Sequence, residues 1–396
     1  MRPKMIVEEK LSQAVGLLKE FHVDLWMTFV RESSSNPDPM LDLILGTGCT
    51  WPSAFVITSK GRKVALVGSL DVQNIKDHAG YEVKGYRDSI RQDLLDLLRK
   101  EDPEKIAVNF SRNDVMADGL SHGMYMILTD YLKETPYSGR LVSSEEIVAA
   151  LRGRKTAAEL ERIKDAICET LEIFDKVTAF VRPGRTEKEV AGFIKDRLAE
   201  AGLEAAWDEV HCPAVFTGPE SAGAHAGPTD RKIEPGHLMN IDFGVRKNDY
   251  VADLQRTWYF SRPGERRVPD EVMKGFLTIR DSIKEAAKVL RPGVEGWKVD
   301  DVARSFIVEE GFKDYDHGLG HQVGRKAHDG SGLLCPKWER YGQLPFLKVE
   351  QGQVYTLEPR LTVAGHGIAT IEEIVVVTED GCEFLSTPQE ELIVIN

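Results

Sequence analysis

The chain has 396 residues, of which 42% are hydrophobic and 29% charged, and it carries a net charge of −13. This length allows two domains of ordinary size, and the composition is that of a soluble globular protein. The negative charge, without a cluster of Lys and Arg, makes nucleic acid an unexpected partner.

No apolar run approaches the ~18 residues of a membrane span, and the N-terminus turns acidic at Glu8 before a signal-type core develops. We therefore expect a cytoplasmic protein with no membrane contact. The five cysteines are scattered and never form a C-x-x-C pair. This spacing argues against a disulfide framework, so reduced thiols are expected.

The first part of the chain alternates short apolar strands with helical stretches. Strands are predicted at residues 25–30, 54–57 and 64–67, the last two joined by a turn at Lys60-Gly61. Residues 1–150 are therefore predicted to form an α/β domain.

Two helices with capping boxes follow. Thr156 and Thr186 each precede a glutamate by three residues and open an apolar helical stripe, the second of which stops at Gly202. Residues 181–203 then resemble residues 290–312, 109 positions later, with Arg-Pro-Gly and the terminal Gly in register. This pattern indicates an internal duplication, in which each copy supplies two helices and strands to one shared sheet.

A hairpin is predicted at residues 239–258, between the two copies. Asp242 lies among alternating apolar residues of the first strand, and Asp253 lies on one face of the second. With the turn centred on Lys247-Asn248, Asp242 would lie opposite Asp253, at a Cβ separation of roughly 4.5–5.5 Å. Two carboxylates on a mostly apolar sheet repel each other unless a cation or a shared proton compensates.

Further candidate ligands follow the hairpin. The glycine-rich segment 317–324 contains His317 and His321, and His328 comes soon after it. Glu358 ends a predicted strand at residues 354–359. A second strand at 370–377 carries Glu372 and Glu373 on opposite faces, so only one of them can face the same site. Four carboxylates and one imidazole suit two divalent cations such as Mn²⁺, Co²⁺, Fe²⁺ or Zn²⁺.

In this order of motifs, residues 155–396 resemble the M24 metallopeptidase family, which includes methionine aminopeptidase, aminopeptidase P, prolidase and creatinase and has the pita-bread fold. The shared order is Asp, Asp eleven residues later, G-x-G-H, E-P and I-E. Residues 1–150 resemble the smaller creatinase-type domain of prolidase and aminopeptidase P. The resemblance implies an α+β pita-bread catalytic domain over residues 151–396, a peptide substrate and a homodimer.

The resemblance also implies roles for individual residues. Two divalent metal ions, most often Mn²⁺ or Co²⁺ and alternatively Zn²⁺ or Fe²⁺, would be bound by Asp242, Asp253, His321, Glu358 and Glu372, with Asp253 and Glu372 bridging them. His225, His328 and His317 match further family histidines. In the mechanism that we expect, the metals ionise a water and Glu358 accepts and returns its proton. His328 stabilises the oxyanion, and His225 places the scissile amide or leaving group.

The expected reaction is hydrolysis of Xaa-Pro bonds in dipeptides or at peptide N-termini. Three residues depart from the family pattern: Thr370 stands where prolidases have Arg, Arg360 replaces the glycine after Glu-Pro, and Arg325 places charge near the substrate position. Arg325 or Arg360 could pair with a substrate carboxylate. The alternatives are a creatinase-like or other non-peptide C–N hydrolase and a catalytically silent pita-bread binding protein.

Overall fold

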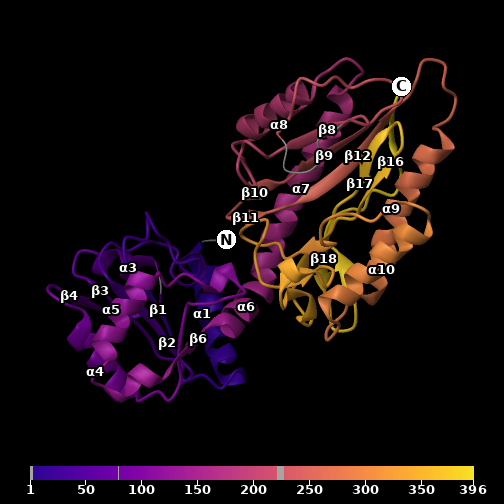
Figure 1. The fold of residues 1–396 in the computed structure, drawn as a ribbon. Helices are drawn as coiled ribbons and strands as arrows, with labels where there is room; N and C mark the ends of the chain where they lie inside the picture. Colours follow the sequence, from indigo (N-terminus) through magenta and orange to yellow (C-terminus); the bar gives the residue numbers. More distant parts are fainter. Residues whose placement is uncertain (1–2, 79, 221–226) are drawn as a thin grey trace. The chain divides into compact units, whose positions relative to one another are not determined.

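The computed structural model describes residues 3–78, 80–220 and 227–396 (Figure 1). The chain divides into two compact units, Met1–Arg152 and Gly153–Asn396. Among the described residues, no helix combines the length and the apolar character that crossing a lipid bilayer requires. All five cysteines are free thiols, as expected.

The first unit is built on a six-stranded mixed sheet with the order β4-β3-β2-β1-β5-β6. The strands are β1 (Leu25–Val30), β2 (Ser53–Thr58), β3 (Lys63–Gly68), β4 (Glu82–Tyr86), β5 (Ile106–Val108) and β6 (Leu141–Ser143). The three predicted strands and the turn at Gly61, which has a φ of 91°, are confirmed.

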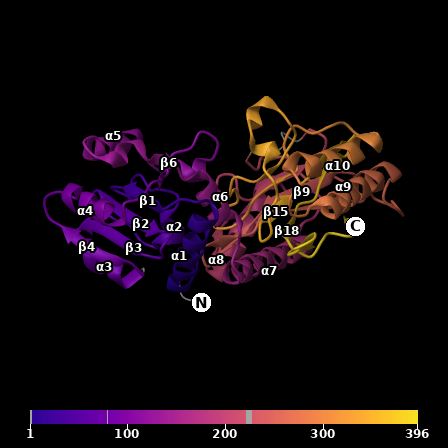
Figure 2. The same ribbon diagram turned by 90° about the horizontal axis from the view of Figure 1, so that it is seen from below.

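Helices cover both faces of this sheet, because its strands are apolar on both sides. Trp26 and Phe55 pack with α1 (Pro3–Glu20), α2 (Leu41–Ile44), α3 (Val72–His78) and α6 (Glu145–Gly153). Met27 and Val56 pack on the other face with α4 (Arg91–Glu101) and α5 (His122–Leu132). Figure 2 shows α5 on the side of the sheet opposite α1 and α3.

The second unit contains two helix pairs beside several small sheets (Figure 1). The pairs are α7 (Ala157–Phe180) with α8 (Glu187–Ala201), and α9 (Asp270–Val289) with α10 (Gly296–Glu309). The central sheet has the order β20-β12-β9-β8, with β8 (Ala214–Thr217), β9 (Leu238–Phe243), β12 (Leu254–Phe260) and β20 (Ile393–Ile395).

Smaller sheets flank the central one. They contain β7 (Glu204–Ala205), β10 (Val245–Lys247) and β11 (Tyr250–Val251); β13 (Gly320–His321) and β14 (Leu333–Leu334); β15 (Val354–Leu357), β18 (Glu373–Val377) and β19 (Cys382–Phe384); and β16 (Arg360–Val363) and β17 (Gly367–Thr370).

The predicted capping boxes are present. Thr156 and Thr186 each accept a hydrogen bond from the backbone of the glutamate three residues later, whose side chain accepts one from the threonine N–H. Gly202 ends α8 in the left-handed conformation, with a φ of 64°. Such reciprocal caps are local, so they can be predicted without tertiary contacts.

The internal duplication is visible in backbone detail. Gly184 before α8 and Gly293 before α10 have φ values of 94° and 85°. The N–H of Gly184 donates to the carbonyl of Ile233, and that of Gly293 donates to the carbonyl of Val349, each at 2.8 Å. The two halves therefore repeat the same turn, the same hydrogen bond to a segment about 50 residues later, and the same helix, as expected for a pseudo-twofold duplication.

Candidate metal centre

The predicted hairpin exists, but its register differs from the prediction. Asp242 on β9 pairs with Gln255 on β12, not with Asp253. The turn is centred on Asn248-Asp249, both of which have positive φ values, of 51° and 68°. Left-handed conformation at both central residues is what a tight two-residue hairpin turn requires, and Asn and Asp tolerate it. The turn therefore shifts the pairing by two residues.

A shift of two residues keeps every side chain on its predicted face, because the side-chain period of a strand is two. Asp242 and Asp253 consequently remain on one face, as diagonal neighbours. Gly244 allows the backbones to approach here, since a Cβ at this position would lie 1.8 Å from the carbonyl oxygen of Ala252.

Three segments of the second copy supply the other candidate groups. His321 is on β13, and its backbone N–H donates to Thr356 Oγ1 at 3.1 Å. Glu358 follows β15, where its N–H donates to the carbonyl of Leu319 at 2.7 Å. The predicted strand at 370–377 is interrupted: β17 ends at Thr370 and β18 begins at Glu373. Glu372 lies in the interruption and forms an isolated bridge with Gln255.

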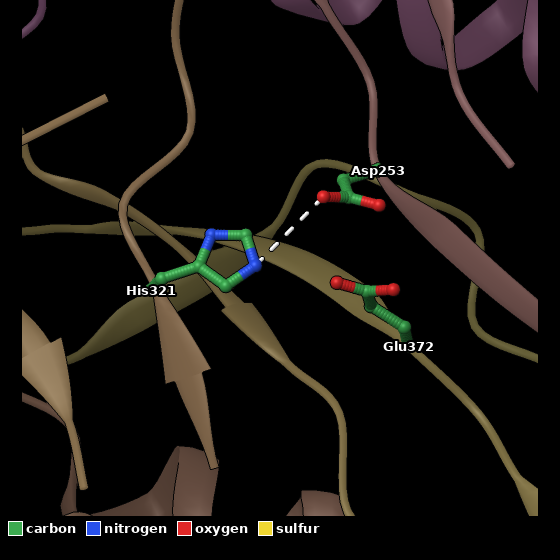
Figure 3. A group of neighbouring side chains, drawn as sticks. All are labelled: Asp253, His321 and Glu372. Atoms are coloured by element: carbon green, nitrogen blue, oxygen red, sulfur yellow. Dashed lines mark ion pairs between the residues drawn. The ribbon is translucent and has the colours of Figure 1, made fainter. Parts of the chain in front are cut away.

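Glu372 and Glu373 are directed to different surroundings. Glu373 forms a buried ion pair with Arg256 at 3.1 Å and accepts a hydrogen bond from Ser386. Glu372 instead joins Asp253 and His321, and the three residues offer ligand atoms within 4.8 Å of one another. Figure 3 shows both carboxylates directed toward the same edge of the imidazole ring.

The candidate centre is compact and mostly buried. Nε2 of His321 lies 3.2 Å from Glu358 Oε1 and 3.8 Å from Asp253 Oδ2. Nδ1 of His321 faces the carbonyl oxygen of Gln322 at 3.4 Å. A proton on Nδ1 therefore leaves Nε2 as the nitrogen available to a metal. Glu372 is 1% exposed and Asp253 is 6% exposed.

Burial and mutual repulsion shift the pKa values of the acids. Burial, reinforced by the neighbouring carboxylates, raises the pKa of Asp242 and of Glu372 well above the ordinary range. For Asp253, burial outweighs the charge of His321 and raises the pKa to about 7.

The histidine and Glu358 shift in opposite directions. Burial alone would lower the pKa of His321, but the hydrogen bond and charge of Glu358 together with the charge of Asp253 raise it to about 9. Burial opposes ionisation of Glu358, yet His321 keeps its pKa below the ordinary value. Such clustered, perturbed groups are typical of functional sites.

Two carboxylate oxygens provide a direct test of metal fit. Asp242 Oδ1 and Glu372 Oε1 are buried, and neither has a hydrogen-bond partner in the described part of the chain. A buried oxygen without a hydrogen-bond partner lowers the free energy of unfolding by about 1–3 kcal/mol, and by more when the group is charged. Divalent cations bind carboxylate oxygens and imidazole nitrogen, so the donor set present here fits them.

The remaining predicted residues differ in their surroundings. The ring of His328 is exposed and stacks on His321 with centroids 4.0 Å apart. His317 is half-buried, and its charge lowers the pKa of Glu358 after the larger effects of burial and His321. Arg325 lies 3.7 Å from Asp249, so it has a partner within the fold. His225 lies outside the described residues.

Arg360 and Thr370, two of the departures from the family pattern, are directly opposite each other in the β16–β17 pair. The side chain of Thr370 contacts Gln255, which in turn contacts Glu358 and Glu372. Gln255 was not singled out from the sequence. Its position two residues after Asp253, on the same strand face, was the available signal.

Known proteins agree with this architecture. The model of metallopeptidase family M24 matches residues 161–379. The chain is 27% identical over 310 residues to the Xaa-Pro dipeptidase of Pyrococcus furiosus, covering 75% of this chain and 83% of that protein. It is also 27% identical over 349 residues to the probable dipeptidase PepE of Mycobacterium tuberculosis, covering 87% and 85%.

Solved structures share the fold over nearly the whole chain. The X-Pro aminopeptidase of Thermotoga maritima superposes with a TM-score of 0.72 at 24% identity, covering 97% of this chain and 99% of that one. The Xaa-Pro dipeptidase of Bacillus anthracis gives a TM-score of 0.75 at 22% identity, covering 98% and 99%. The expected pita-bread fold is thereby confirmed. Since the family match spans more than half of the sequence, the chain belongs to metallopeptidase family M24.

Proposed function

We propose that the protein hydrolyses the peptide bond that precedes proline, with two divalent ions bound by Asp242, Asp253, His321, Glu358 and Glu372. The observation that carries the proposal is the cluster of acids around His321 Nε2, with two buried carboxylate oxygens that have no partner among the described residues. Proline specificity is supported by relatives that are Xaa-Pro dipeptidases.

The bound ions would supply a water that ionises near neutral pH and positive charge for the developing oxyanion. Asp253 and Glu372 offer ligand atoms within 4.8 Å of each other and of His321, and the family resemblance supports them as the ligands that both ions would share. The side chain of Glu358 is 18% exposed, more than those of His321 and Asp253, and it faces His321 through one oxygen. Its position suits a ligand that also accepts and returns the proton of the attacking water.

Two histidines outside the ligand set complete the proposed site. His328 is exposed and stacks on His321, so it can reach a substrate above the cluster and donate to the oxyanion. His225 is proposed to hold the scissile amide on the strength of the family resemblance. Residues 151–396 form the catalytic domain in this proposal, and the homodimer expected from the resemblance stays a prediction.

Arg360 is the better candidate of the two arginines for a substrate carboxylate. Arg325 is engaged by Asp249, whereas the side chain of Arg360 forms no hydrogen bond or ion pair among the described residues and has Asp316 as its nearby charge. We expect Arg360→Ala to raise KM for dipeptides with a free carboxylate and to leave KM for their amides unchanged. Equal effects on both substrates would contradict this role.

The proposal is tested by assaying Xaa-Pro dipeptides, longer Xaa-Pro peptides, matched Xaa-Ala peptides and creatine with Mn²⁺, Co²⁺ and Zn²⁺. We expect metal-dependent cleavage of one or both Xaa-Pro classes and little of Xaa-Ala. Hydrolysis of creatine alone would favour a non-peptide C–N hydrolase. Absence of hydrolysis in a metal-loaded, folded protein would favour the binding-protein alternative.

A further inference from the structure

A neutral side chain, Gln255, contacts two of the proposed metal ligands. Its Nε2 donates to Glu372 Oε2 at 3.0 Å and to Glu358 Oε2 at 3.3 Å. A glutamine amide has two N–H donors, so one is available for each carboxylate. The residue is 9% exposed, and its backbone carbonyl accepts from the N–H of Glu372 at 3.1 Å.

The oxygen end of this amide contacts Thr370. The hydroxyl of Thr370 lies 2.9 Å from Gln255 Oε1 and 3.0 Å from the carbonyl oxygen of Pro359. Rotating the amide by 180° would place Oε1 against the two carboxylates, where oxygen would face oxygen. The two carboxylates therefore fix the orientation, with both N–H groups directed at the ligands, and this leaves Oε1 as an acceptor for the single hydroxyl proton of Thr370, which the carbonyl of Pro359 shares.

Thr370 is itself held in place. It is 4% exposed, and its backbone N–H and carbonyl both pair with the hydroxyl of Thr257, at 3.2 and 2.6 Å. Thr370 therefore contacts Gln255, and Gln255 contacts Glu358 and Glu372, which come from different segments of the chain. Hydrogen bonds of this kind orient metal ligands, and their loss commonly costs roughly 10–100-fold in metal affinity or activity.

From these contacts we infer that Gln255, supported by Thr370, is a positioning residue for the metal centre: it holds Glu358 and Glu372 in the arrangement that binds the ions. This inference rests on the proposed function. It assigns support of the ligands to an uncharged pair, one member of which, Thr370, stands where prolidases have an arginine by the resemblance noted above. Arg360 lies opposite Thr370 on the neighbouring strand, and Arg256 donates to the backbone carbonyl of Glu372 at 3.0 Å while its charge pairs with Glu373.

The test measures metal binding without substrate, by calorimetric titration of the metal-free full-length protein with Mn²⁺ or Co²⁺. We expect Gln255→Met to weaken binding of at least one ion by tenfold or more. Thr370→Val, which keeps the shape but removes the hydroxyl, should weaken it in the same direction. Thr370→Ser, which retains the hydroxyl, should bind within about threefold of wild type.

Gln353→Met is the matched control, because Gln353 is a buried glutamine of the same unit that bonds to Tyr355 and Glu350 rather than to the cluster. It should bind metal like wild type. The absorption spectrum of bound Co²⁺ gives a second readout, which should change in Gln255→Met and Thr370→Val only. At saturating metal, KM of these two variants should return closer to the wild-type value than kcat does.

The outcomes separate the two proposals. If wild type binds two ions and folded Gln255→Met and Thr370→Val bind them with unchanged affinity and spectrum, the positioning role is wrong and the proposed function stands. If Gln255→Met does not fold, the metal affinities of Thr370→Val and Thr370→Ser are compared instead, and equal affinities would refute the positioning role. If wild type binds no divalent ion, both proposals fail.

Discussion

Removing the metal should make the fold sensitive to alkaline pH through Asp253. A carboxyl whose pKa is higher in the folded than in the unfolded chain stabilises the fold at low pH. That contribution is lost as the pH rises from its ordinary pKa through its folded pKa. For Asp253 these values are 3.8 and about 7. At ~1.4 kcal/mol per pKa unit, Asp253 alone should make the metal-free protein about 3 kcal/mol less stable at pH 8 than at pH 5.

The neighbouring groups do not reverse this direction. The raised pKa of His321 also removes stability as the pH rises, between 6.5 and about 9. The lowered pKa of Glu358 adds stability as the pH rises toward its ordinary value of 4.5, so this contribution is nearly complete at pH 5. Metal binding should abolish the loss, because the ions compensate the carboxylate charges.

The assay is scanning calorimetry of chelator-treated protein between pH 5 and pH 8. A loss of about 3 kcal/mol corresponds to a fall in Tm of roughly 6–12 °C for a unit of this size. Residue 253 cannot titrate in Asp253→Asn, so this variant should lose about 3 kcal/mol less stability than wild type over the same pH range. Asp301 is an exposed acid on α10, so Asp301→Asn should show the same pH dependence as wild type. If metal-free wild type and Asp253→Asn show the same pH slope, the electrostatic reasoning is refuted.

Two further predictions concern the scaffold of the cluster. Arg256→Met leaves Glu373 buried without its partner and should cost about 3–5 kcal/mol in urea unfolding, and the double variant Arg256→Met/Glu373→Gln should cost less than the sum of the single changes. Wild-type stability of Arg256→Met would contradict this pairing. Gly244→Ala should lose several kcal/mol because its Cβ would collide with Ala252, whereas Gly192→Ala, with open space inside α8, should gain up to about 1 kcal/mol. Similar effects of the two glycine changes on urea unfolding would contradict the close approach.

Local features of the fold could be predicted because their causes are local. The capping boxes at Thr156 and Thr186 depend on residues three apart, and both are present. The face occupied by Asp242 and Asp253 follows from strand alternation, and this too holds. Their exact pairing could not be predicted, because it depends on whether Asn248 and Asp249 both adopt left-handed conformation.

Features that depend on distant segments were not predictable from the sequence alone. The interruption at Glu372 reflects its bridge to Gln255, which is more than a hundred positions earlier. Alternation could not decide which of the adjacent glutamates faces the cluster; the family resemblance indicated Glu372, and the pairing of Glu373 with Arg256 agrees with it. The contacts of Gln255 with two carboxylates likewise require three segments to meet.

Metal stoichiometry tests the central claim most directly. The chain should be dialysed against Mn²⁺ or Co²⁺, freed of excess ion and analysed by mass spectrometry of its metal content. We predict two divalent ions per chain in wild type and fewer in Asp253→Asn, with both proteins folded. Wild type without stoichiometric metal, or an Asp253→Asn variant that retains both ions, would contradict the account.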